Sequence, residues 1–131
     1  LADSPTETPT ASFDVEDADD NLTNVPPGAV RDLLVLEHRG GDPLPADDYF
    51  VRIKNPGNGL AELNSTAPAR INVAADVRLA SDTARLSVGD RVVVEIVSTH
   101  GYDFTAVGEW RIAVVHRPSE TLVYDREVRL T

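Results

Sequence analysis

Short apolar runs, interrupted by turns rich in glycine and proline, are the feature that most limits how this chain can fold. The run Leu33-Leu34-Val35-Leu36 is followed by a charged segment and the turn Gly40-Gly41-Asp42. After a proline-containing stretch, a second run begins, Tyr49-Phe50-Val51-Arg52-Ile53. Apolar runs of this length that are bounded by turn residues are typical of consecutive β-strands. The pattern therefore predicts an all-β domain.

About seven or eight strands follow from this pattern along the chain, and no segment predicts a convincing helix. The strands are expected at 11–16, 31–39, 48–54, 70–79 (one strand or two short ones), 91–97, 109–116 and 121–130. Residues 60–63 also allow a single helical turn. This number and spacing of strands favour an immunoglobulin-like antiparallel β-sandwich. Residues 1–12, in which Pro, Thr and Ser dominate, predict a stalk or linker, and residues 13–131 form the sandwich domain.

Alternation within the strands predicts which side chains share a face. The expected groups are Tyr49, Val51 and Ile53; Trp110, Ile112, Val114 and His116; and Leu122, Tyr124, Val128 and Leu130. Trp110 is the single tryptophan and is expected to anchor the core between the two sheets. The chain has no cysteine, so packing and strand pairing must hold the domain together.

The charge of the chain indicates the kind of environment in which such a domain works. The chain has 22 Asp+Glu against 12 Lys+Arg, a formal net charge of -10, and Lys54 is its one lysine. A surface this acidic repels nucleic acid and anionic lipid, which argues against phosphate-backbone binding. Concentrated salt screens such repulsion within about 3 Å, and hydrated carboxylates keep the surface wet. We therefore favour a halophilic extracellular protein over an ordinary acidic secreted domain.

No residue pattern predicts catalysis, a cofactor or a metal, so we expect no catalytic, cofactor-binding or metal-binding residues. His38, His100 and His116 lack HxH or HExxH spacing and are expected to be lone surface histidines. The acidic run 14–20 lacks the spacing and the glycine of an EF-hand, which favours a solvated loop over a calcium site. The chain also lacks a GxSxG motif. Its glycine pairs, such as Gly40-Gly41, predict turns with positive φ.

Two sequons, Asn21-Leu22-Thr23 and Asn64-Ser65-Thr66, provide possible N-glycosylation sites at Asn21 and Asn64. Both lie in predicted loops, where a glycan has room. Methionine is absent even at position 1, so we expect that a segment before Leu1 has been removed. The chain has no apolar run long enough to span a bilayer.

Several segments together resemble the head domains of haloarchaeal type IV pilins. Leu1-Ala2-Asp3-Ser4, the Pro/Thr linker and Ala11-Ser12-Phe13-Asp14 resemble the junction after the N-terminal hydrophobic helix of these pilins. Residues 34–49, which contain His38-Arg39-Gly40-Gly41-Asp42, resemble a hydrophobic-x-His-x-Gly-Gly-Asp segment of their heads. Gly89-Asp90-Arg91-Val92 and 110–115 fit the later strands of that domain.

The resemblance implies a structural subunit of an extracellular archaeal filament, with the β-rich head exposed on the filament surface for adhesion or attachment. Self-association into a helical filament would occur through the missing N-terminal hydrophobic helix, which alone would meet the membrane before assembly. No enzymatic activity and no nucleic-acid partner are implied. Charged residues at strand positions are expected to discourage open-ended edge pairing. These residues are Arg91, Arg111, Arg117 and Asp125.

Two other classes of function remain open at this point. The first is a cell-surface binding domain anchored by one helix, similar to an archaellum stator or an envelope- or glycan-binding module. The second is a secreted glycosidase, because a β fold can place two of the 22 carboxylates at catalytic distance without a sequence motif. No nucleophile and base can be nominated for it from the sequence.

Overall fold

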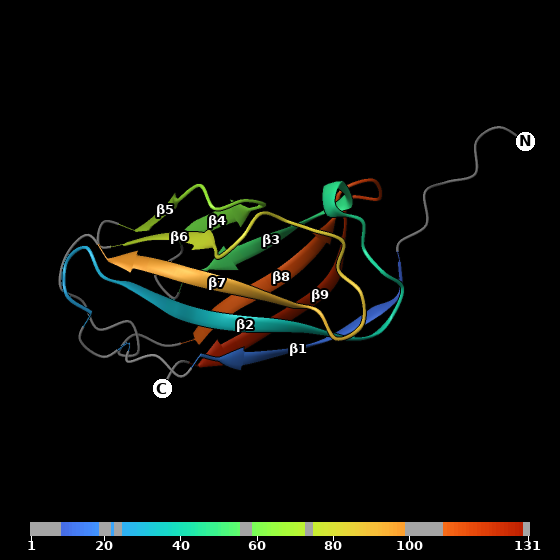
Figure 1. Cartoon of the computed structure of the whole chain (residues 1–131), viewed down its shortest axis with the longest axis horizontal. Helices are drawn as coiled ribbons and strands as arrows, with labels where there is room; N and C mark the ends of the chain where they lie inside the picture. The colour runs from blue at the N-terminus through green and yellow to red at the C-terminus, as the bar shows by residue number, and fades with distance from the viewer. Residues whose placement is uncertain are drawn as a thin grey trace, which may run out of the picture.

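The computed structural model describes residues 9–18, 22, 25–55, 59–72, 75–98 and 109–129. In this part of the chain, nine strands form two antiparallel sheets that pack as a sandwich, which confirms the predicted fold class (Figure 1). The strands are β1 (Ala11–Asp17), β2 (Val30–Gly41), β3 (Tyr49–Lys54), β4 (Leu60–Leu63), β5 (Ala69–Asn72), β6 (Ala75–Leu79), β7 (Arg91–Ser98), β8 (Glu109–His116) and β9 (Thr121–Arg129). One 3-10 turn, Ala46–Asp48, precedes β3.

The strand order is β1-β2-β7-β6-β5 in the five-stranded sheet and β4-β3-β8-β9 in the four-stranded sheet. The chain crosses from one sheet to the other after β2, β4 and β7, which gives the Greek-key connections of an immunoglobulin-like sandwich. The five-stranded sheet lies in front in Figure 1, with β3, β8 and β9 behind it. No helix in the described part of the chain is long and apolar enough to cross a bilayer.

The core forms between the two sheets from the alternating side chains of both. Trp110 is only 1% exposed, which confirms its prediction as a core anchor. Tyr49, Val51 and Ile53 are buried together as predicted, and the Tyr49 hydroxyl donates a hydrogen bond of 2.8 Å to the Ala84 carbonyl. Burial of this hydroxyl raises its pKa. Tyr49 therefore keeps its proton and joins β3 to the segment before β7.

Two local predictions were wrong because strand pairing decided the structure. Residues 60–63 form β4 rather than a helical turn, and they pair with β3 in a register that buries Ala61 and Leu63. In β9, the register shifts so that Tyr124 lies opposite Val114 while Leu122 lies opposite Val115. This bulge places Leu122 on the outer side of the sheet, where it is 45% exposed, rather than on the side of Tyr124.

The expected role of charged residues at the sheet edges was also only partly correct. The edge strands are β1 and β5 in one sheet and β4 and β9 in the other. Arg91 and Arg111 lie on the interior strands β7 and β8, so they do not guard a free edge. Asp125 does lie on the edge strand β9, but its carboxylate binds Arg111. The edges of β1 and β9 are instead close together, because the rings of Phe13 and Tyr124 lie 5.4 Å apart.

Candidate functional site

The segment that contains His38 and Asp42 is a clamp that joins the start of β1, the end of β2 and the turn before β7. The His38 side chain is fully buried, and its Nε2 lies 2.7 Å from the Asp42 carbonyl oxygen. The main chain of His38 accepts from Gly89 N and donates to Asp90 O. Asp42 binds Thr10 twice, since Asp42 N donates to Thr10 O at 2.7 Å and Thr10 N donates to Asp42 Oδ2 at 3.0 Å. His38 is therefore a structural residue of this turn and not a surface histidine as predicted.

Gly41 is required at this clamp. Its φ is +94°, and a Cβ there would lie 2.2 Å from the carbonyl oxygen of Thr10. The predicted positive φ is thus confirmed at Gly41. Phe13 packs edge-on against the His38 ring with centroids 5.1 Å apart, which ties β1 to the same clamp. The segment holds the point where the chain enters the domain.

The histidines do not form a shared site in the described residues. His116 lies on β8 in the other sheet and is 5% exposed, so its prediction as a surface residue was also wrong. Its Nδ1 lies 2.7 Å from Ser119 Oγ, a serine–histidine contact that the sequence analysis missed. The same turn contains a hydrogen bond from Thr121 Oγ1 to Ser119 O, so the contact closes the β8–β9 hairpin. His100 lies outside the described residues.

A hollow of about 250 Å³ lies beside Tyr49, lined by residues 81–86 and 90–93. Its two carboxylates already hold turns: Asp82 Oδ1 accepts from Thr66 N at 3.0 Å, and Asp90 Oδ2 accepts from Ser87 N at 2.9 Å. Among the described residues, no group of three or more His, Asp or Glu is placed to hold a metal ion. The hollow is therefore better explained as part of the loop structure than as a reaction site.

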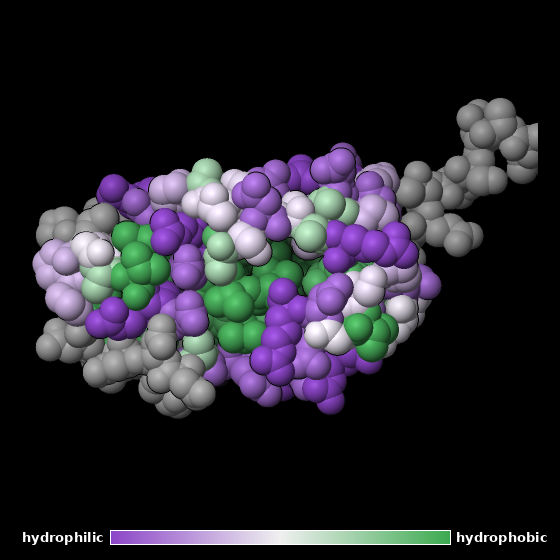
Figure 2. All heavy atoms as spheres, in the orientation of Figure 1, coloured by the Kyte–Doolittle hydropathy of each residue, from purple (hydrophilic) through white to green (hydrophobic). Residues whose placement is uncertain are grey.

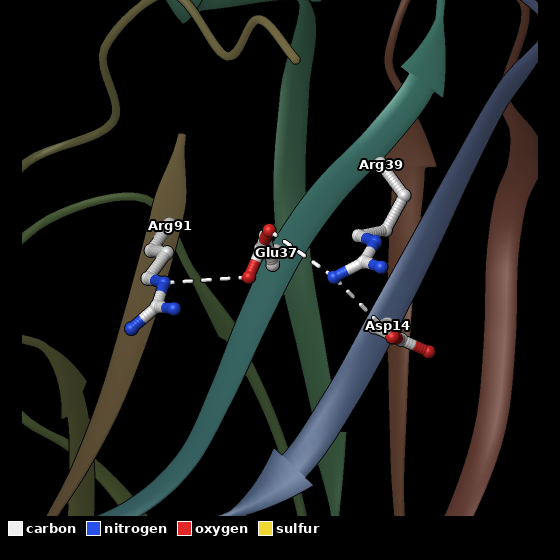
Figure 3. A network of polar contacts seen from close by, with 4 residues as sticks. All are labelled: Asp14, Glu37, Arg39 and Arg91. Carbon is white, nitrogen blue, oxygen red and sulfur yellow. Dashed lines mark hydrogen bonds and ion pairs between the residues drawn. The ribbon is translucent and has the colours of Figure 1, made fainter. Parts of the chain in front are cut away.

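The outer side of the five-stranded sheet, called here the five-stranded face, carries a ladder of ion pairs. Arg39 lies 3.8 Å from Asp14 and 3.4 Å from Glu37, and Glu37 also binds Arg91 at 3.4 Å (Figure 3). Two further pairs, Arg70–Asp76 at 2.6 Å and Arg78–Glu95 at 3.0 Å, lie on the same face. Arg39, Arg70, Arg78 and Arg91 of this face therefore each have a carboxylate partner.

The middle of the five-stranded face is apolar. Figure 2 shows hydrophobic side chains gathered over β2 and β7, with hydrophilic side chains around them. Strand register places Val35 opposite Val93 and Val30 opposite Val97 in this region. Val30 is 39% exposed, and the other three valines are half-buried. These four residues are called the valine patch below.

The outer side of the four-stranded sheet, the four-stranded face, is hollowed. Two hollows of about 340 Å³ each lie along it, and Arg52 lines both. The first is lined by Arg52, Lys54, Leu60, Arg111, Ala113, Leu122 and Asp125, and the second by Phe50, Arg52, Val115, Arg117 and Glu120. Leu60 is 53% exposed and Leu122 is 45% exposed. The two hollows form a groove with apolar side chains on a sheet that is otherwise charged.

Two cations of this groove differ from the rest because no carboxylate among the described residues pairs with them. Arg111 binds Asp125 through two bonds of 2.7 Å, and Arg52 binds Glu62 at 2.9 Å. Lys54 and Arg117, by contrast, form no ion pair with the described residues. The Arg117 guanidinium lies 4.7 Å from the centroid of the Phe50 ring.

The pKa values on the four-stranded face reflect this arrangement. The hydrogen bond and charge of Arg111 hold the pKa of Asp125 below its ordinary value. The carboxylate of Glu109, by hydrogen bonding and by like charge, raises the pKa of Glu127. Asp125 is therefore stabilised as an anion, whereas Glu127 is held beside another acid at the end of the face.

Asn64, one of the two possible glycosylation sites, has an exposed side chain. Its carbonyl accepts a hydrogen bond of 2.9 Å from Thr83 N, so its position in the loop is fixed by the main chain. A glycan on Asn64 would extend into solvent, and glycosylation there stays a prediction. Asn21 lies outside the described residues, as do residues 1–8 of the expected stalk.

Comparison with protein-family models, curated proteins and solved structures gave no match to this chain. The candidate surface must therefore be judged on its own geometry. Strand alternation places Phe50, Arg52 and Lys54 on the side of β3 opposite to Tyr49, Val51 and Ile53. The partners of these residues on β8 and β9 came only from the strand order and the β9 bulge, which local pattern does not contain.

Proposed function

We propose that this chain is the exposed head domain of a structural subunit of an extracellular, type IV pilus-like filament of a halophilic archaeon, serving adhesion or surface attachment. The observation that carries the proposal is the pair of extended, chemically different outer faces on one rigid sandwich. Such faces suit repeated contacts between subunits better than chemistry on a small substrate. The resemblance of residues 1–14 and 34–49 to pilins supports the same assignment.

The clamp at His38 and Gly41 supports this function mechanically. In a filament, the head is joined to the filament core by the segment that precedes β1. Thr10 sits at that junction and binds Asp42 through two hydrogen bonds. These bonds, together with the glycine-dependent approach of Gly41, hold Thr10 firmly against the end of β2. A hydrophobic helix before Leu1 would provide the core of the filament and the membrane contact before assembly.

The acidic surface also fits a filament in concentrated salt. Packed copies of a domain with a formal net charge of -10 repel one another strongly in dilute buffer. At molar salt this repulsion is screened within about 3 Å, so neighbouring heads can pack closely. A glycan on the exposed Asn64 would face the medium.

The test is electron microscopy of filaments sheared from cells that express the full-length subunit, compared with cells from which its gene is deleted. We expect helical filaments that carry this sandwich on their outer surface and that are absent from the deletion strain. Identical filaments in both strains, or a subunit that stays in the membrane fraction, would reject the proposal.

The groove of the four-stranded face favours a second candidate, a cell-surface binding domain anchored by one helix, such as an archaellum-stator-like or envelope- or glycan-binding module. Its exposed leucines and unpaired cations would then contact another component of the envelope. This candidate predicts that the protein is recovered from membranes as a single copy and never in sheared filaments. The same fractionation therefore separates the two candidates.

A further inference from the structure

We propose that the four-stranded face of one copy docks on the five-stranded face of a second copy, so that the sandwiches stack front to back. The inference deepens the proposed function and rests on it for the assembly of a long filament. The contact itself depends only on the apolar side chains and the unpaired charges of the two faces.

The apolar parts of the two faces are complementary in kind. The groove presents Leu60 and Leu122, two of the most exposed large apolar side chains among the described residues. The five-stranded face presents the valine patch, with Val30 exposed at one end. Apolar contact of this kind does not weaken in concentrated salt, where ion pairs between exposed groups are largely screened. A contact that works for a halophilic protein needs such an apolar centre.

The unpaired cations of the groove and the unpaired carboxylate of the five-stranded face have opposite sign. Lys54 and Arg117 flank the groove and have no carboxylate partner among the described residues. On the five-stranded face the arginines of the ion-pair ladder are already paired, and Glu16 projects from β1 without an ion pair in the described part of the chain. Residues 1–30, which contain β1, include no lysine or arginine. The cationic groove therefore meets its complement on the β1 side of a second copy.

Such a contact can continue from copy to copy instead of stopping at a closed dimer. The two faces lie on opposite sides of one sandwich, so a copy that uses its four-stranded face still has its five-stranded face free. A contact between two different surfaces is heterologous and propagates into a helical array unless the rotation closes a ring. A contact of the four-stranded face with itself would stop at a dimer.

The experiment uses three variants of the 131-residue chain in molar KCl. The front variant, Leu60→Glu with Leu122→Glu, breaks the groove, and the back variant, Val30→Glu with Val93→Thr, breaks the valine patch. The matched control is Val88→Glu, because Val88 is 60% exposed but lies in the turn before β7, outside both faces. Circular dichroism and thermal unfolding establish that each variant is folded, and sedimentation velocity measures association.

We expect the unmodified chain and Val88→Glu to self-associate with concentration, and the front and back variants each to associate about tenfold more weakly or not at all. The decisive sample is the equimolar mixture of front and back variants. One intact groove and one intact valine patch remain in that mixture, so it should form a dimer that stops at two copies. The milder change Leu60→Ser with Leu122→Ser, which also removes the apolar side chains of the groove, gives a second front variant if the glutamate substitutions impair folding.

Three results would overturn the inference: no association of the unmodified chain, an equal loss in Val88→Glu, or a back variant that still dimerises alone. In the host, filaments built normally from the front variant would also reject this contact and leave the filament function standing. Stacking in solution without any filament in the host would reject the filament function and leave the contact standing.

Discussion

Strand alternation builds both outer faces of the sandwich, but the two faces differ in how many of their charged side chains form ion pairs. On the five-stranded face, Glu37 bridges Arg39 and Arg91, and the other arginines of the ion-pair ladder are paired. On the four-stranded face, Lys54 and Arg117 are unpaired with respect to the described residues, beside the exposed Leu60 and Leu122. Paired charges must lose a partner before they can pair with a group of another molecule, whereas unpaired cations and exposed leucines have no such partner to lose. The four-stranded face is therefore expected to contribute more to the binding of a partner than the five-stranded face.

The outer faces are distinct from the core if their side chains contribute less to stability than core side chains do. Strand β8 allows a direct test because it carries side chains of both kinds. Trp110 points inward from this strand and Val115 points outward. We expect Trp110→Ala to lower the free energy of unfolding by about 3–5 kcal/mol, because it leaves a large cavity between the sheets. Val115→Ala should cost about 1–2 kcal/mol, since fewer buried groups are lost. Denaturant unfolding in molar salt measures both values. Equal losses would mean that the groove is part of the core, and the comparison would fail.

The pairing of charges predicts a smaller difference between the two faces. Glu37→Gln removes the centre of the ion-pair network, in which Arg39 is 55% and Arg91 is 67% exposed. Because exposed pairs are weak, we expect a loss of about 1 kcal/mol or less in dilute buffer, which shrinks as salt is added. Lys54→Gln should leave stability unchanged at every salt concentration. Thermal unfolding of both variants across a salt series measures the effect, and the same salt response in Lys54→Gln would contradict it.

The fold class followed from the sequence because strand alternation is local. Tyr49, Val51 and Ile53 alternate with Phe50, Arg52 and Lys54. The position of Trp110 within a β-branched run predicts its burial without knowledge of the partner strand. The positive φ of Gly41 was equally local, although Gly40 and Gly41 extend β2 and pair with β1 instead of forming a separate turn. Each of these predictions needed only the residues of one segment and its immediate flanks.

The features that escaped prediction depend on residues far apart in the sequence. The His38 ring packs against Phe13, and the His38 main chain binds the turn at Gly89 and Asp90; both lie in other parts of the chain. Leu122 faces outward because β9 bulges in its pairing with β8, and the bulge leaves no clear local signal. The groove depends on both the order of four strands and that bulge. The candidate surface could therefore not be assembled from sequence alone, although several of its residues were placed on the outer side of their strands.

The smallest expected effect concerns the strength of the ion pair between Arg111 and Asp125 within the groove, as reported by the pKa of Asp125. The folded pKa of Asp125 lies below its ordinary value, so its pairing stabilises the fold above the unfolded pKa, and this stability is lost as the pH falls through the folded pKa. Arg111→Gln should raise the pKa of Asp125 toward its ordinary value, as measured by NMR titration of the carboxyl groups. The matched control Glu109→Gln should act in the opposite direction on Glu127, lowering a pKa that the neighbouring carboxylate raises. If the pKa of Asp125 does not change in Arg111→Gln, Arg111 is as free as Lys54 and Arg117. The four-stranded face would then offer three available cations, and the contrast with the five-stranded face would be sharper than the ion-pair distances indicate.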